Sequence, residues 1–266
     1  MDGVIFEQNS STLSTICIVE NLSDELKELI RNNLSSICQG VSRGESGKSI
    51  YSYRNTLEEF LIRYDTKTKN TKKGIIGELL AHILFIEFFQ DFQTVSPLFN
   101  MEERNIKKSF DVILFHASSQ ELYYTEVKSG SARNYGCNKK NINLLYAAKA
   151  DILEKLNVDN DNNWLNAING STIALEKKKI KNEIVNILEE CLEDSQKHTS
   201  GSTTKNIILV SVTYNSLIDK IMLSWIHRYS SNLSSGDDFK IPILFSIQKD
   251  TYNSIEIFLR NEVDNG

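Results

Sequence analysis

Proline, paired cysteines, an excess of basic residues and long apolar runs are scarce or missing in this chain. Only 2 prolines and 12 glycines occur among 266 residues, which argues against a long flexible linker and favours one large domain. The most apolar stretch, residues 75–89, is too short to span a bilayer and contains Glu78, His82 and Glu87. We therefore expect a buried helix there and no contact with a membrane.

The cysteines do not form a motif. No Cys-x-x-Cys pair is present, and no histidine lies at the spacing of a zinc ligand; the four positions are Cys17, Cys38, Cys137 and Cys191. Free thiols in a reducing compartment are the expected state. The first residues, MDGVIFEQNS, lack the basic-then-apolar pattern of a signal peptide. We expect a cytoplasmic protein.

The charge balance limits how the chain could bind nucleic acid. Its formal net charge is −5, whereas a protein that binds nucleic acid by itself is usually basic. Any such contact must therefore come from a local basic patch or from a partner.

Two segments come close to known ligand-binding loops. Residues 42–49, SRGESGKS, nearly match a phosphate-binding P-loop, but Ser42 stands where the motif needs glycine. We interpret them as a surface loop, with an NTPase loop as the weaker alternative. Residues 159–164 resemble the start of a calcium loop. Trp164 occupies its glycine position and Gly170 its closing acid position, so we reject that interpretation.

Hydrophobic periodicity predicts alternating strands and helices. Strands are expected at 4–7, 14–20, 92–99 (an edge strand), 111–115, 122–128, 206–214 and 240–247. Helices are expected at 23–37, 50–64, 74–89, a segment ending near 156, 172–194 and 215–229. Residues 254–260 fit either a strand or a helix.

Charged residues interrupt the central apolar segments. Glu78 lies within the apolar helix, Asp111 opens one strand, and Glu126 and Lys128 lie near the end of the next. Because strand side chains alternate between faces, Glu126 and Lys128 emerge on the same side. The short polar segment 116–121 is typical of a hairpin, which places Asp111 beside Glu126. We expect a helix packed on that face to bring Glu78 to the same point.

Three carboxylates at one point repel one another and resist desolvation. A divalent cation bound by oxygen ligands would resolve that conflict, so the pattern predicts a metal site. The alternative is a surface ion cluster in which Lys128 pairs with Glu126 at a solvated strand end.

Basic residues flank this motif on both sides. They are Lys69, Lys72 and Lys73 before the apolar helix, and Arg133, Lys139 and Lys140 after the second strand. They could be part of solvated loops or could contact the phosphates of a nucleic acid, and the sequence leaves both interpretations open.

Glu78, Asp111 and Glu126-Val127-Lys128, on elements in the order helix, three strands, helix, strand, resemble the PD-(D/E)xK nuclease core. The resemblance implies an α/β (α+β) fold with a restriction-endonuclease-like αβββαβ core and a mixed sheet. We expect one nuclease domain over 1–266: an N-terminal α/β extension (1–65), the core (66–214) with a helical insertion at about 157–200, and a C-terminal α/β segment (215–266). The family's proline is missing, because Ser109-Phe110 precedes Asp111.

A narrower resemblance is to HamA, the nuclease subunit of the Hachiman anti-phage system. The segments GIIGELLAHILF, FDVILF and YYTEVKSG carry it, together with the chain length and the helical stretch before the last strands. It implies an endonuclease that cleaves DNA with Mg²⁺ or Mn²⁺. Glu78, Asp111, Glu126 and the Val127 carbonyl would hold the metal, and Lys128 would orient the attacking water. It also implies a helicase partner, HamB, that restrains the nuclease.

Two other functions fit the same fold. One is a non-catalytic subunit that binds a helicase, although the intact set of four motif residues argues against such a loss of activity. The other is an RNase.

Overall fold

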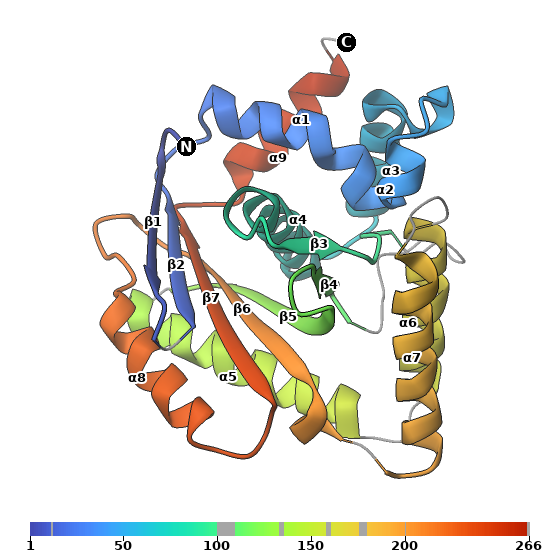
Figure 1. Ribbon diagram of the computed structural model, residues 1–266. Coiled ribbons are helices and arrows are strands. Elements are labelled where there is room, and N and C mark those ends of the chain that lie inside the picture. The colour runs from blue at the N-terminus through green and yellow to red at the C-terminus, as the bar shows by residue number, and fades with distance from the viewer. Residues whose placement is uncertain are drawn as a thin grey trace.

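A seven-stranded mixed sheet forms the centre of the protein (Figure 1). The computed structural model describes residues 1–11, 13–99, 110–132, 136–157, 161–175, 180–199 and 201–264. Within them the strand order is β1-β2-β7-β6-β5-β4-β3. The strands are β1 Val4–Asn9, β2 Ser14–Val19, β3 Phe92–Thr94, β4 Val112–His116, β5 Glu121–Ser131, β6 Asn206–Tyr214 and β7 Ile241–Lys249. The fold is therefore of the mixed α/β class.

Strand direction explains the apolar sequences at the centre of the sheet. β2, β7, β6 and β5 run parallel to one another. At one edge β1 pairs antiparallel with β2, and at the other β4 pairs antiparallel with both β5 and β3. Central parallel strands are covered on both faces and so read as continuous apolar runs. Accordingly, every residue of β6 is buried.

Helices connect and cover these strands. Their bounds are α1 Asp24–Gln39, α2 Val41–Gly44, α3 Tyr53–Asp65, α4 Lys69–Phe88, α5 Cys137–Asn157, α6 Asp161–Ala174, α7 Lys181–Gln196, α8 Leu223–Ser234 and α9 Asn253–Asp264, with 3₁₀ turns η1 Ser49–Tyr51 and η2 Ser202–Thr204. The predicted order of helix, three strands, helix and strand is present as α4, β3, β4, β5, α5 and β6. A restriction-endonuclease-like core stays a prediction. Within the described ranges, no helix combines the length and apolarity needed to cross a bilayer.

Each face of the sheet has its own hydrophobic core. One core joins the sheet to α1, α3, α4 and α9, and the other joins it to α5, α6, α7 and α8 (Figure 1). The alternation of side chains in β5 shows the two faces: Tyr123 and Val127 belong to the α4 core, and Leu122 and Tyr124 to the α5 core. Successive residues of β5 therefore contact different helices.

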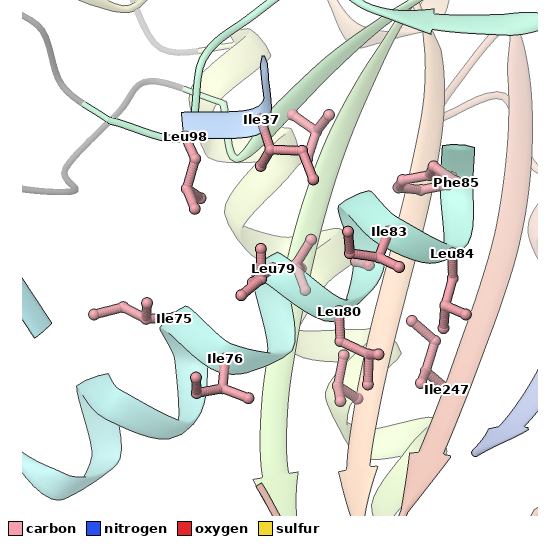
Figure 2. Packing of buried hydrophobic residues seen from close by; sticks show 14 of the residues in the cluster. Ile37, Ile75, Ile76, Leu79, Leu80, Ile83, Leu84, Phe85, Leu98 and Ile247 are labelled. Carbon is pink, nitrogen blue, oxygen red and sulfur yellow. The ribbon is translucent and has the colours of Figure 1, made fainter. Parts of the chain in front are cut away.

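Helix α4 is apolar on most of its surface because it lies between the sheet and α1. Figure 2 shows Leu84 beside Ile247 of β7, while Leu79 and Ile83 lie on the side towards Ile37 of α1. All four of these α4 and α1 residues are buried, like Ile247. The predicted buried helix is confirmed.

Several predicted elements are confirmed with changed boundaries. Helix α4 begins at Lys69 rather than Gly74, because the Thr68 side chain caps it by accepting a hydrogen bond from the Thr71 backbone N–H (3.3 Å). The N-terminal strand pair, the edge strand β3 and the β4–β5 hairpin follow the prediction. The ambiguous segment 254–260 is helical and lies in α9.

Two predicted helices are wrong in extent. The single helix expected at 172–194 instead covers the end of α6 and most of α7, which are separate helices. The helix expected at 215–229 begins only at Leu223. The preceding loop has its own partners, since the Ile221 N–H donates to Gln248 Oε1 at 2.8 Å and the Gln248 amide donates back to the carbonyl of Asp219. These side-chain contacts replace the helical bonds that the prediction assumed.

Candidate active site

The hairpin of β4 and β5 brings Asp111 and Glu126 together. Val112 pairs with Thr125 at the start of β4, and residues 117–120 form the turn. One position further along the antiparallel pair, Asp111 stands opposite Glu126. The Asp111 carboxylate accepts a hydrogen bond from the backbone N–H of Val127 at 2.7 Å. The predicted neighbourhood of these two strand residues is confirmed.

An aromatic cluster fixes the chain just before Asp111. Phe110, the residue before Asp111, is buried against Tyr124 and Trp164, with ring centroids 4.9 Å and 5.4 Å away. Because Trp164 belongs to α6, that helix supports the residue next to the site. Phe110 thus anchors Asp111 by packing.

The Glu126 carboxylate is buried between two lysine side chains. Only 1% of its side chain is exposed. One oxygen accepts a hydrogen bond from Lys128 Nζ at 2.6 Å, and the other accepts one from Lys155 Nζ of α5 at 2.6 Å. The pairing of Lys128 with Glu126 that the alternative of a surface ion cluster expected is therefore present, but the Glu126 carboxylate is buried and not solvated.

Helix α5 supplies two residues that the sequence analysis missed. Asp151 Oδ2 lies 2.5 Å from Lys128 Nζ, and Lys155 pairs with Glu126. The two residues are four positions apart and therefore lie on one face of the helix. The sequence did contain a signal for these two residues. They lie on either side of Ile152, a buried residue on the apolar stripe of the predicted helix. Charged residues beside such a stripe lie at the boundary of a packed face and can reach an adjacent buried charge.

Burial and charge shift the proton equilibria of the site. Burial raises the pKa of the Glu126 carboxyl, the negative charge of Asp111 raises it further, and Lys155 and Lys128 offset part of the effect. For Lys128, burial alone would lower the pKa of its ammonium. The carboxylates of Glu126 and Asp151 more than compensate, and the pKa of Lys128 lies above its ordinary value of 10.5. Lys128 is therefore a cation over the physiological pH range.

Glu78 approaches from the other face of the sheet. Helix α4 packs on the face of Val127, and its Gly77 comes so close to Ser129 that a Cβ there would lie 2.0 Å from the Ser129 hydroxyl. Glu126, by contrast, contacts α5. The expectation that α4 covers the face carrying Glu126 is wrong, because the alternation of β5 directs residues 127 and 129 to α4 and residue 126 to α5.

A route for Glu78 remains at the edge of β5. Among the described strands, β4 pairs with β5 only up to Thr125, and residues 126–131 have β6 alone as a strand neighbour. Glu78 is half-buried and directly follows Gly77, so it lies near the strand level of Ser129. Its part as a third ligand stays a prediction.

The donor set suits a magnesium-type ion. Within the part of the chain that the structure describes, no three His, Cys, Asp or Glu side chains gather as a metal-binding group. Mg²⁺ commonly uses only one or two protein carboxylates and keeps water at its other positions. Asp111 and the buried Glu126 provide such a pair of hard oxygen ligands. These two carboxylates therefore fit the ion, and the parts of the Val127 carbonyl and Glu78 stay predictions.

The comparison with family models gives a match over nearly the whole chain. A model of the HamA family matches residues 4–261. The chain belongs to the HamA family. The match runs from β1 into α9, so the segments on both sides of the αβββαβ elements are part of what the family shares. Membership indicates a role in Hachiman anti-phage defence. The curated proteins give no match.

In this HamA-family chain, the first predicted basic group lies in the first two turns of α4. Lys69 is exposed, while Lys72 Nζ is 3.4 Å from Asp65 and 4.8 Å from the centre of the Tyr64 ring. Lys73 donates a hydrogen bond to the Ser131 hydroxyl at the end of β5 (3.2 Å). These lysines are thus in a helix and not in a solvated loop, and Lys73 borders the strand that carries the candidate site.

The second basic group lies at the start of α5. Lys139 is exposed, and Lys140 crosses the end of β5, where a Cβ on Gly130 would lie 2.9 Å from its Nζ. Gly130 is on the same face of β5 as Lys128, so both lysines lie on the face of β5 that α5 covers. Arg133 lies outside the described residues. Contact of any of these lysines with nucleic acid stays a prediction.

Proposed function

We propose that this chain is a metal-dependent endonuclease that hydrolyses DNA phosphodiester bonds as the effector of a Hachiman defence complex. The observation that carries the proposal is the buried Glu126 carboxylate, held next to Asp111 and Lys128 at the end of a hairpin. An acid this deeply buried and this perturbed is costly for the fold, and such groups are concentrated at functional sites.

Each site residue has a chemical role in this proposal. Asp111 and Glu126 would hold Mg²⁺ or Mn²⁺, with the Val127 carbonyl and Glu78 as further ligands. When bound, the ion would supply a Lewis acid that activates water and offsets negative charge on the phosphate. Lys128 would orient the attacking water and stabilise the charge that develops on the phosphoryl oxygens. In the metal-free site the neighbouring carboxylates raise the pKa of Lys128, which suits a role as a cationic hydrogen-bond donor.

Plasmid digestion tests the proposal. Purified chain, alone and with the proposed helicase partner, is mixed with supercoiled plasmid and millimolar Mg²⁺. Glu126→Gln and Lys128→Ala should each reduce cleavage at least about a hundredfold, because the first removes a charged metal ligand and the second removes the group that acts on the reacting phosphate. Glu126→Gln keeps the shape of the buried side chain, so its loss of activity cannot be attributed to a cavity.

A matched control lies on the same strand. Glu121 is at the start of β5 and pairs with Lys240 at 2.6 Å, away from the site. Glu121→Gln should cleave like the wild type. Wild-type cleavage by Glu126→Gln or by Lys128→Ala would show that the assigned centre is wrong. Parallel digestion of DNA and RNA oligonucleotides of equal length distinguishes the DNase from an RNase on the same scaffold.

The second candidate function is a non-catalytic subunit that binds a helicase. The observation that favours it is a group of apolar side chains on the loop before α8 and on the first turn of that helix. Ile218 is 97% exposed, and Met222 and Trp225 are about half exposed. Large apolar side chains on a fixed loop are typical of contact surfaces between proteins. Under this function, Ile218→Ser and Trp225→Ser would weaken partner binding, while Glu126→Gln would leave phage protection unchanged.

A further inference from the structure

Both charged side chains of the candidate site on β5 are held by the same turn of α5. Lys155 Nζ lies 2.6 Å from Glu126, and Asp151 Oδ2 lies 2.5 Å from Lys128 Nζ. One helix therefore supplies a cation to the carboxylate and an anion to the ammonium.

The two α5 groups carry the charges of the ligands that a nuclease site would bind. An ammonium at Glu126 has the sign of a divalent metal ion, and a carboxylate at Lys128 has the sign of a phosphate group. We propose that α5 holds the site in a closed state, in which Lys155 occupies the metal position at Glu126 and Asp151 occupies the phosphate position at Lys128. This inference rests on the proposed nuclease function and adds a means of restraint within the chain itself.

The exposed fractions show which side chains can move. Glu126 is 1% exposed, whereas the side chains of Lys155 and Asp151 are 22% and 46% exposed. Lys155 and Asp151 can therefore turn into solvent without opening the core, while Glu126 cannot leave its position. Opening the site requires a change of rotamer on α5 or a small displacement of that helix.

The closed state lowers the affinity for metal in a measurable way. Lys155 must leave Glu126 before a divalent cation binds there. The free energy of the broken Lys155–Glu126 contact therefore reduces the net free energy of metal binding. A hydrogen bond between charged groups is strong enough to change an equilibrium constant by about tenfold or more. Replacement of Lys155 by a neutral residue should therefore tighten metal binding by about that factor, even though it removes only a residue outside the ligand set.

Calorimetric titration of the DNA-free chain with Mn²⁺ tests this inference. Lys155→Met keeps the length of the apolar stem and should bind Mn²⁺ about tenfold more tightly than the wild type. Lys155→Gln, which keeps a hydrogen-bond donor without the charge, should change in the same direction. The matched control is Lys149→Met on the same helix, because Lys149 pairs with Asp238 at 2.7 Å and is 26% exposed, similar to Lys155. Lys149→Met should bind like the wild type.

Glu126→Gln separates the two possible failures. If wild-type Mn²⁺ binding does not depend on Glu126, the proposed metal site is wrong and the inference fails with it. If the binding depends on Glu126 but both Lys155 variants bind no more tightly than the wild type, only the closed state is overturned.

The Asp151 half of the proposal has its own readout. In EDTA, Asp151→Asn should bind a short DNA duplex more tightly than the wild type in fluorescence anisotropy, because Lys128 becomes available to a phosphate. Asp238→Asn removes the same charge from the Lys149 pair and is the control. Equal DNA affinity of the two variants would refute the role of Asp151 as a phosphate substitute.

Discussion

The contact between Gly77 of α4 and Ser129 of β5 provides a sharp test of how the two elements are packed. A Cβ at position 77 would lie 2.0 Å from the Ser129 hydroxyl oxygen, 3.1 Å from the Ser129 Cβ and 3.4 Å from the Tyr214 hydroxyl. The hydroxyl can rotate away, but the strand Cβ cannot. At Gly74, one turn earlier, no atom lies within 4 Å of such a Cβ. Both glycines therefore lie inside α4, but the space around Gly77 is filled by neighbouring side chains and the space around Gly74 is open.

The magnitudes follow from two opposing effects. Alanine is favoured over glycine in a helix interior by about 0.5–1 kcal/mol, so Gly74→Ala should stabilise the protein by that amount. Gly77→Ala has the same gain, but an overpacked contact costs about 1–3 kcal/mol. Its net effect should be a loss of up to about 2 kcal/mol. For a chain of this size, each kcal/mol corresponds to roughly 2–4 °C in Tm.

Urea unfolding in EDTA measures both variants without any influence of metal. The pair Gly77→Ala and Ser129→Ala should be coupled, because removal of the hydroxyl relieves the closest contact. Gly77→Ala should also reduce cleavage more than Gly74→Ala, since Glu78 is the next residue. A Gly77→Ala protein as stable as Gly74→Ala would refute the close packing of α4 on β5.

Three further predictions concern charge. Metal-free Asp111→Asn should be at least as stable as the wild type, because the charge that repels Glu126 is gone. With Mn²⁺ at a hundredfold excess over Kd, the wild type should gain roughly 2.7 kcal/mol of stability in a thermal melt. Asp111→Asn should lack most of that gain. Because the pKa of Glu126 is raised in the folded state, the contribution of this carboxyl group to metal-free stability should be fully present below the ordinary glutamate pKa of 4.5 and should be lost as pH rises through the raised value. Glu126→Gln should remove this part of the pH dependence in urea titrations. Reversal of Lys69, Lys72 and Lys73 to Glu should weaken DNA binding and flatten its dependence on salt, and an unchanged slope would show that these lysines contact no phosphate.

The local part of the site could be predicted because it depends on rules of short range. Alternation along a strand places Glu126 and Lys128 on one face, and a short polar turn places Asp111 beside Glu126. The structure reproduces both relations. The apolar run of α4 likewise predicts that the helix is buried, whichever face of the sheet it covers.

The remaining part depends on tertiary packing, which periodicity does not encode. Helix α4 is apolar on most of its surface, so the pattern could not show which face of the sheet it covers, and Glu78 was expected on the wrong side. Lys155 is 29 residues from Glu126 in the sequence and Asp151 is 23 residues from Lys128, and their pairing follows only from the way α5 crosses β5. The late start of α8 depends on Gln248, whose amide binds the loop from another strand.

Anomalous diffraction from crystals of the protein with Mn²⁺ tests the central claim most directly. The proposed site predicts a peak roughly 2.1 Å from carboxylate oxygens of both Asp111 and Glu126, with Lys155 Nζ displaced from Glu126. A Mn²⁺ peak elsewhere, with Lys155 and Lys128 still bound to Glu126, would contradict it.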